Sequence, residues 1–124
     1  MRRRLTSSEH DEQTAVIRWW DVACNVYGFP YFALMAIPNA GKRSYGAAVW
    51  MRSEGLRVGI PDLFLAIPRC GLGGLWIEMK RGKNKPSGPQ HLVIEYLSMQ
   101  YAVIVAYSAD EAIAAIKAHV GAIK

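Results

Sequence analysis

The chain has 124 residues, 52% of them hydrophobic and 20% charged, which is the composition of one globular domain with a single core. No apolar run reaches the roughly 18 residues of a membrane span, and no apolar stretch follows the basic start of the chain, so neither a membrane helix nor a secretory signal is expected. The formal net charge of +5 favours a polyanionic partner. Cys24 and Cys70 lack metal-ligand spacing and are expected to be free thiols in a reducing cytoplasm.

The first predicted element is a long helix that follows a basic arm. Residues 1–8 are expected to be flexible, and residues 9–124 to form the single domain. The helix should begin at Glu9 and end at Tyr27, because Ser8 and Asp11 make an S-x-x-D capping pattern. Its apolar residues recur at helical spacing and predict a buried stripe of Val16, Trp19, Ala23 and Val26.

Strands and helices alternate along the rest of the chain. A strand is predicted over 31–37 and a helix over 44–54. Two short apolar runs bounded by Gly and Pro, 63–67 and 75–77, are typical of buried strands. The remaining predicted elements are a helix from Ser87 to about Gln100, a strand over 101–107, and a last helix that opens with the capping sequence Ser108–Glu111 and turns Ala112, Ile113, Ile116 and Val120 inward. This order predicts an α/β sandwich around a mixed sheet.

Two carboxylates and a lysine lie on the two central strands. Asp62 begins one strand after Gly59-Ile60-Pro61, and Glu78 and Lys80 end the next after a gap of 15 residues. Side chains alternate along a strand, so Glu78 and Lys80 share a face, which Asp62 approaches if the strands pair. Two buried carboxylates repel each other, and a hard cation such as Mg²⁺ or Mn²⁺ would relieve the repulsion. With a lysine that can orient water or hold a phosphate, the set favours hydrolysis of a phosphodiester.

Each of these residues also has an ordinary structural interpretation. Asp62 fits a Gly-x-Pro-Asp turn, Glu78 fits an ion pair with Lys80 or Arg81, and Lys80 fits a solvated charge at a strand end. The three residues in this order and at this spacing nevertheless favour a catalytic set.

Glu12 and Gln90 are further candidates with open alternatives. Glu12 lies at helical spacing from the predicted stripe, so it is either an acid favoured by the dipole of its own helix or a third carboxylate that reaches the metal. Gln90 completes an S-x-x-Q capping box with Ser87, and from that position it could also face the site.

Basic and aromatic residues give weaker signals. The segment from Asn39 through Lys42 to Arg43 is either an ordinary loop or a contact to backbone phosphates. The loop with Arg81, Lys83 and Lys85 would neutralise phosphates if it lies beside the site. The four tryptophans are expected to pack in the core rather than to stack on bases; they are Trp19, Trp20, Trp50 and Trp76. No Walker loop or dinucleotide-binding motif occurs, so no nucleotide cofactor is expected.

The succession of Gly59-Ile60-Pro61-Asp62, Glu78-Met79-Lys80 and Ser87 with Gln90 resembles the VRR-NUC domain, the virus-type replication-repair nuclease branch of the PD-(D/E)XK superfamily. The resemblance covers the chain from about Glu12 to Val120. It implies a restriction-endonuclease-like αβββαβ core with one helix inserted after the first strand. It also implies an Mg²⁺ or Mn²⁺ site formed by Glu12, Asp62, Glu78 and the main-chain carbonyl of Met79, with Lys80 as the catalytic lysine and Gln90 as a supporting residue.

The function expected from the resemblance is metal-dependent endonuclease action on DNA, with a preference for branched DNA such as Holliday junctions. Stand-alone chains of this size resemble phage and bacterial members that act as homodimers, so a homodimer in the cytoplasm of a bacterial or phage-infected cell is expected. The DNA contacts are expected at the two basic segments and at Ser87. The alternatives are a DNA-binding or assembly module that keeps the fold without catalysis, and a metal-dependent hydrolase of RNA or small phosphoesters.

Overall fold

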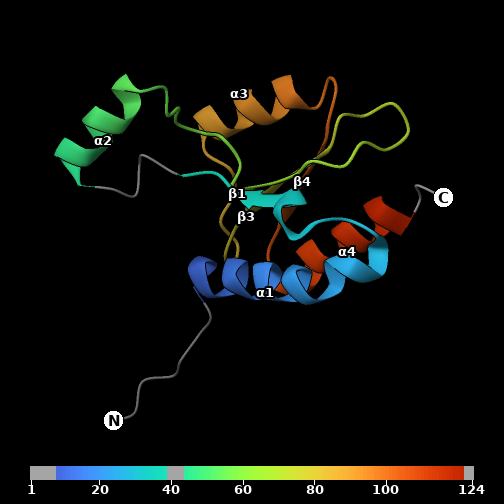
Figure 1. The fold of residues 1–124 in the computed structure, drawn as a ribbon. Helices are drawn as coiled ribbons and strands as arrows, with labels where there is room; N and C mark the ends of the chain where they lie inside the picture. The colour runs from blue at the N-terminus through green and yellow to red at the C-terminus, as the bar shows by residue number, and fades with distance from the viewer. Residues whose placement is uncertain (1–7, 39–43, 122–124) are drawn as a thin grey trace, which may run out of the picture.

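The computed structural model describes residues 8–38 and 44–121, and in it four strands form one sheet between helices (Figure 1). The strands lie in the order β1 (Leu34–Ala36), β2 (Leu63–Leu65), β3 (Leu75–Met79) and β4 (Ala102–Ala106). The β1–β2 and β2–β3 pairs are antiparallel, whereas β3 and β4 are parallel. The helices are α1 (Glu9–Tyr27), α2 (Tyr45–Ser53), α3 (Gly88–Leu97) and α4 (Ala109–Gly121).

The helices divide between the two faces of the sheet. α1 and α4 lie together against one face, called here the core face, and α3 lies against the opposite face, called the α3 face (Figure 1). α2 is inserted between β1 and β2 and stands apart from the sheet. The predicted mixed sheet flanked by helices, with one helix inserted after the first strand, is therefore confirmed. Within the described ranges, no helix combines the length and apolarity needed to cross a membrane.

Local capping signals set the helix boundaries. Ser8 accepts a hydrogen bond from the backbone N–H of Asp11, whose carboxylate accepts one in return, so α1 begins at the predicted residue. Ser87 and Gln90 form the same reciprocal box at the start of α3. The strand predicted over 31–37 is shorter, because residues Tyr31–Ala33 form a 3₁₀ turn. The indole N–H of Trp20 donates to the carbonyl of Tyr31 over 2.8 Å in this turn.

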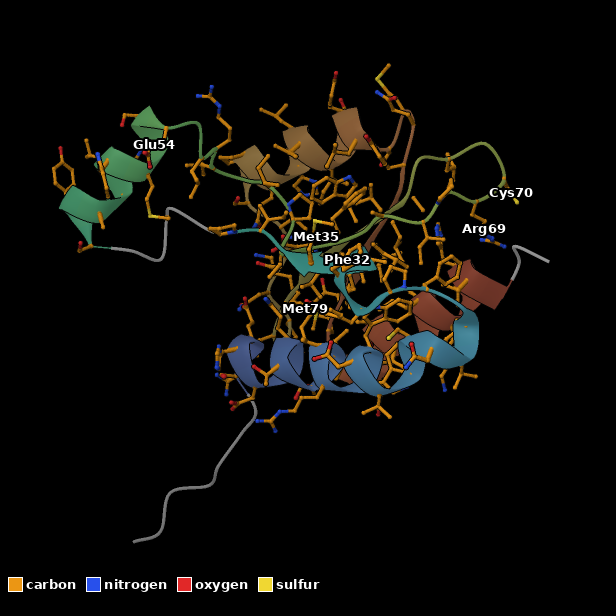
Figure 2. The ribbon with its side chains drawn as sticks, viewed as in Figure 1. Phe32, Met35, Glu54, Arg69, Cys70 and Met79 are labelled. Carbon is orange, nitrogen blue, oxygen red and sulfur yellow. The ribbon has the colours of Figure 1, made fainter. Side chains whose placement is uncertain are left out.

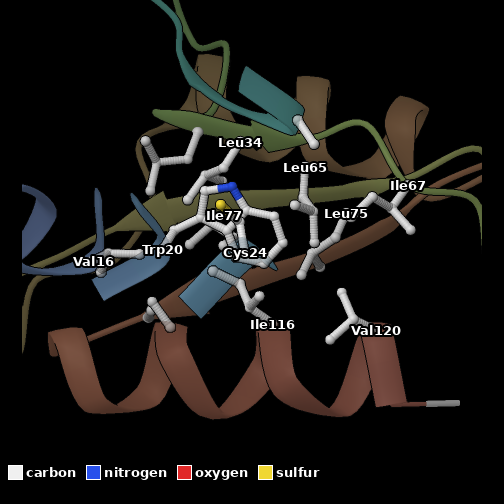
Figure 3. Packing of buried hydrophobic residues seen from close by; sticks show 14 of the residues in the cluster. Val16, Trp20, Cys24, Leu34, Leu65, Ile67, Leu75, Ile77, Ile116 and Val120 are labelled. Atoms are coloured by element: carbon white, nitrogen blue, oxygen red, sulfur yellow. The ribbon is translucent and has the colours of Figure 1, made fainter. Parts of the chain in front are cut away.

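The hydrophobic core lies between the sheet and the α1–α4 pair (Figure 3). The residues of α1 that are fully buried there are Val16, Trp20 and Cys24, spaced four apart. The predicted stripe was wrong in placing Val26 inside, since that residue is 84% exposed. At about 100° per residue, Val26 points about 120° away from Trp20 around the helix. α1 is oriented with Trp20 toward the sheet, where the indole is buried and its N–H has a hydrogen-bond acceptor in the carbonyl of Tyr31.

β3 contributes alternate side chains to the two faces. Leu75, Ile77 and Met79 belong to the core, and Figure 2 shows Met79 between the sheet and α1. Trp76 and Glu78 point to the α3 face, where Glu78 meets a side chain of α3. The strand that holds the core together therefore carries the candidate catalytic carboxylate on its other side.

Trp50 departs from the expectation that all four tryptophans pack inside. It lies on α2 and is 69% exposed, whereas Trp20 is fully buried and Trp19 and Trp76 are partly buried. The reason is that α2 packs through small residues, and Ala48 is its one buried residue.

Candidate active site

Strand pairing brings the two central carboxylates together. Leu63 lies opposite Ile77 in the antiparallel β2–β3 register, so Asp62 and Glu78, one residue beyond each, meet at the same end of the sheet. The Asp62 carboxylate accepts a hydrogen bond from the backbone N–H of Met79 over 2.8 Å. Asp62 is 7% exposed and Glu78 is 3% exposed. The sequence therefore predicted correctly which two acids approach each other, and pairing of the two strands is the cause.

Lys80 and Gln90 complete the cluster around Glu78. The ammonium group of Lys80 lies 3.4 Å from Oε2 of Glu78, and the Gln90 amide nitrogen donates to the same oxygen over 2.9 Å. The backbone N–H of Lys80 donates to the carbonyl of Ala106, which extends the β3–β4 pairing to the lysine. The structure thus gathers Asp62, Glu78, Lys80 and Gln90 at one place.

The environment of Glu78 opposes its ionised form. Burial raises the pKa of Glu78 to about 7, and the negative charge of Asp62 adds to the rise, while Lys80 works in the opposite direction. A carboxyl group in this state is partly protonated near neutral pH. A divalent cation between Asp62 and Glu78 would favour both ionised forms, so the donor set suits a hard metal ion.

The segment before Asp62 is held against the start of α3. Gly59 has φ +92°, and a Cβ built there would lie 2.8 Å from the carbonyl oxygen of Pro89 and 3.2 Å from the backbone nitrogen of Gln90. Pro61 is fully buried, and the carbonyl of Asp62 accepts from the N–H of Ile37. Glycine is required at position 59 both by the backbone conformation and by this approach. The chain that delivers Asp62 and the helix that delivers Gln90 are therefore in direct backbone contact.

Glu12 has a different role in the structure from the ones weighed from the sequence. Its Oε1 accepts a hydrogen bond from the backbone N–H of Ala109 over 2.7 Å, so it caps the N-terminus of α4. In the described part of the chain, no group of three or more His, Cys, Asp or Glu side chains is arranged to hold a metal ion. The structure therefore does not gather Glu12, Asp62 and Glu78 into one three-carboxylate set, and that ligand set stays a prediction.

Glu9 was not predicted from the sequence to lie near the candidate site. Its charge contributes to the raised pKa of Glu78, which places the first turn of α1 within electrostatic reach of the site. The available signal was that Glu9, Asp11 and Glu12 all lie in that first turn. Spacing from the apolar stripe favoured Glu12, which lies four residues before the buried Val16 and accepts a hydrogen bond from Ala109.

The basic loop after β3 lies near the start of α1. Arg81, Lys83 and Lys85 are all exposed. Hydrogen bonds from Ser8 lower the pKa of Asp11, and the positive charge of Arg81 adds to this effect across the gap between the two segments. Ser87 is exposed and serves as the cap of α3. The candidate DNA contacts Asn39, Lys42 and Arg43, and nearly all of the arm 1–8, lie outside the described residues.

A solved structure described as "VRR_NUC domain protein" is similar to this chain. The TM-score is 0.80 at 26% sequence identity, and the match covers 96% of this chain and 93% of that one. No family model matches the sequence, and no curated protein matches it. The structural likeness confirms the resemblance to the VRR-NUC domain and shows that the chain has the nuclease fold of that domain.

Proposed function

We propose that this VRR-NUC-type domain is a metal-dependent endonuclease that hydrolyses phosphodiester bonds in DNA, with selectivity for branched DNA such as Holliday junctions. The observation that carries the proposal is the buried pair Asp62 and Glu78, with Lys80 and Gln90 against Glu78, in a nuclease fold. A domain that only binds DNA gains nothing from burying two acids where phosphates would lie, because they would repel the ligand.

The proposed metal site consists of Asp62, Glu78, the main-chain carbonyl of Met79, and Glu12. The fit rests on the two adjacent buried carboxylates: burial, with the negative charge of Asp62 adding to it, raises the pKa of Glu78 to about 7. Oxygen donors of this kind suit Mg²⁺ or Mn²⁺. When bound, such an ion would supply charge neutralisation and Lewis-acid polarisation of the phosphate.

The protein groups around the carboxylates would then act on the substrate. Lys80 would orient the attacking water and stabilise negative charge that develops on the phosphate, as its place 3.4 Å from Glu78 allows. Gln90 would hold the Glu78 carboxylate in one rotamer through its amide N–H. Asp62 is fixed in turn by the N–H of Met79, so the acids keep their separation before substrate binds.

DNA would be held mainly through its backbone. The exposed loop with Arg81, Lys83 and Lys85 carries three positive charges beside the site and suits phosphate contacts without reading of sequence. A two-fold homodimer would present two active sites and would suit paired cuts in a junction. The proposal places the reaction in the cytoplasm of a bacterial or phage-infected cell, which suits two cysteines that are both free.

The first test is cleavage of labelled four-way junction, flap, single-stranded and duplex DNA in Mg²⁺, Mn²⁺ or EDTA. We expect cutting with metal only, fastest on branched DNA, and lost in Lys80→Ala. The control is Lys83→Ala, which removes an equal charge from the exposed loop and should weaken binding without abolishing the chemical step. Binding of junctions without cleavage of any substrate would contradict the proposal and would favour the non-catalytic module.

A further inference from the structure

α2 carries its large apolar side chains on the outside. Ala48 is its one buried residue, and Ala47 and Met51 are partly buried. In contrast, 84% of Tyr45 and 69% of Trp50 are exposed. An amphipathic helix normally turns its largest apolar residues toward the core. In α2 this polarity is reversed.

The exposed residues of α2 lie on the side of the helix away from its buried residues. At about 100° per residue, Ala47, Ala48 and Met51 lie within about 100° of one another, whereas Tyr45, Val49 and Trp50 lie on the remaining side, spread over about 140°. Arg52 lies at the edge of this exposed side, between Tyr45 and Ala48 around the helix. We call the surface formed by Tyr45, Val49, Trp50 and Arg52 the α2 face. Large exposed apolar side chains on the outer side of one short helix indicate a binding surface more strongly than single exposed residues do.

α2 lies on the same side of the molecule as the candidate active site. α2 stands out beside the end of the molecule where α3 begins (Figure 1), and Figure 2 shows Glu54, just after α2, on that side. Gly59, six residues after the last residue of α2, contacts the first turn of α3. Six residues span at most about 20 Å, so α2 is tethered close to Asp62 and Gln90.

The charges around α2 favour a nucleic acid as its partner. Arg52 lies on the α2 face and Arg57 follows it, both exposed, and Glu54 is the one acid between residues 44 and 58. Aromatic rings and arginines exposed on one helix match the stacked bases and phosphates of an unpaired strand. α2 alone is too small to hold a second copy of this chain, because a nine-residue helix offers much less than the roughly 800 Å² that each partner of a stable dimer buries.

We infer that the α2 face stacks on unpaired bases next to the phosphate that is cleaved. The inference rests on the proposed function for the position of the cleaved phosphate. Bases inside a continuous duplex are stacked on each other and cannot reach Trp50 or Tyr45. The α2 face would therefore bind DNA in which bases near the cut site are unstacked, at a fork, a flap or the centre of a junction.

The test is equilibrium binding in EDTA, where a metal-dependent enzyme cannot cut. Fluorescence anisotropy would compare a splayed-arm DNA with a continuous duplex of the same length. We expect Trp50→Ala to weaken binding of the splayed-arm DNA about tenfold or more, as loss of a base–aromatic stack does elsewhere, and binding of the duplex less than about twofold. Trp50→Phe should retain most of the affinity. Tyr96→Ala is the matched control, since Tyr96 is 64% exposed on α3, and it should leave the preference for splayed-arm DNA unchanged.

Three results would overturn the inference. One is unchanged binding of the splayed-arm DNA by Trp50→Ala, and another is equal weakening for both DNAs. The third is a fall in molecular mass by light scattering in Trp50→Ala, which would assign the α2 face to a second copy. Cleavage is measured separately, so that the two proposals can fail independently. A protein that cuts no DNA but needs Trp50 to bind splayed-arm DNA would refute the endonuclease and support the role of the α2 face. A protein that cuts DNA and prefers splayed-arm DNA equally well without Trp50 would support the endonuclease and refute the role of the α2 face.

Discussion

The amide of Gln90 donates a hydrogen bond to Glu78, and its orientation is fixed by the start of its own helix. Nε2 lies 2.9 Å from Oε2 of Glu78, while Oε1 accepts the backbone N–H of Ser87 over 2.8 Å. The capping box therefore leaves only the amide nitrogen to face the carboxylate. A residue that fits the pattern of a helix cap therefore also determines which hydrogen-bonding group faces the Glu78 carboxylate.

The exchange Gln90→Glu separates these two roles. Glutamate retains the capping box but replaces the donor with a second carboxylate against Glu78. We expect the cleavage rate to fall at least tenfold at neutral pH, with the CD spectrum of the helices unchanged. Steady-state cleavage kinetics and CD would measure this. Glu95→Gln, an exposed change further along α3, is the control, and wild-type rates in Gln90→Glu would remove Gln90 from the site.

Gly59→Ala tests the contact between the Asp62 segment and α3. The new methyl group would lie 2.8 Å from the Pro89 carbonyl, so the start of α3 has to move and the bond from Gln90 to Glu78 should lengthen. We expect a several-fold loss of cleavage rate and a loss of stability of about 2 kcal/mol or more, measured by kinetics and urea unfolding.

Gly55→Ala is the matched control for that exchange. Gly55 has φ +107°, but a Cβ there meets nothing within 4 Å. The Gly55→Ala variant should therefore lose about 1 kcal/mol of its free energy of unfolding to backbone strain and should keep full activity. Equal activity losses in the two variants would show that strain, rather than the contact with α3, is responsible. A double variant of Gly59→Ala with Gln90→Ala should lose less activity than the two single losses combined.

The raised pKa of Glu78 predicts how stability depends on pH without metal. The folded-state pKa is about 7 and the ordinary value is 4.5, so the native state binds this proton more tightly than the unfolded chain does. The free energy of unfolding should therefore fall as pH rises from about 4.5 to 7, by at most about 3 kcal/mol from this group. Urea unfolding in EDTA at several pH values would measure the slope.

The variant Glu78→Gln should remove that part of the slope, because glutamine does not titrate. Asp11→Asn is the control, since the pKa of Asp11 is lowered and its removal should leave the fall between pH 4.5 and 7 in place. Added Mg²⁺ should raise the melting temperature more at pH 8 than at pH 5, where protons compete for the same oxygens. A wild-type slope identical to that of Glu78→Gln would contradict the assignment.

Glu12→Gln distinguishes a helix cap from a metal ligand. Glutamine keeps an oxygen for the N–H of Ala109 but loses the negative charge. We expect its stability to change by less than about 1 kcal/mol, compared with about 1 to 2 kcal/mol lost in Glu12→Ala. If Glu12 is a ligand, the Mg²⁺ concentration for half-maximal cleavage should rise about tenfold in both variants. An unchanged Mg²⁺ requirement would leave Glu12 as a cap of α4, and Glu9→Gln in parallel would test the neighbouring acid.

Features with local causes could be predicted from the sequence. The capping boxes at Ser8 and Ser87 depend on residues three apart, so the starts of α1 and α3 follow from the chain itself. The short apolar runs bounded by Gly and Pro located β2 and β3, and their pairing placed Asp62 beside Glu78. Alternation along β3 then predicted that Lys80 would lie near Glu78.

Features that depend on distant partners could not be predicted in this way. The direction in which α1 faces the sheet depends on the Tyr31 carbonyl that binds Trp20, and spacing alone does not show this partner. The close approach of Gly59 to Pro89 and the bond of Glu12 to Ala109 join segments far apart in the chain. The exposure of Trp50 follows from packing through Ala48, whereas hydrophobicity alone predicted the opposite.

The alternation of β3 also constrains how this protein can fold. A slip of one residue in the pairing of β3 would turn Glu78 into the core, which contains aliphatic residues such as Val16 and Ile116, and would turn Ile77 and Met79 to the α3 face. Burying an unpaired carboxylate among aliphatic side chains costs several kcal/mol, a large part of the stability of a domain of this size. The misregistered sheet is therefore penalised by the same charge that the proposed endonuclease needs, so Glu78 would also discriminate against wrong strand pairings during folding.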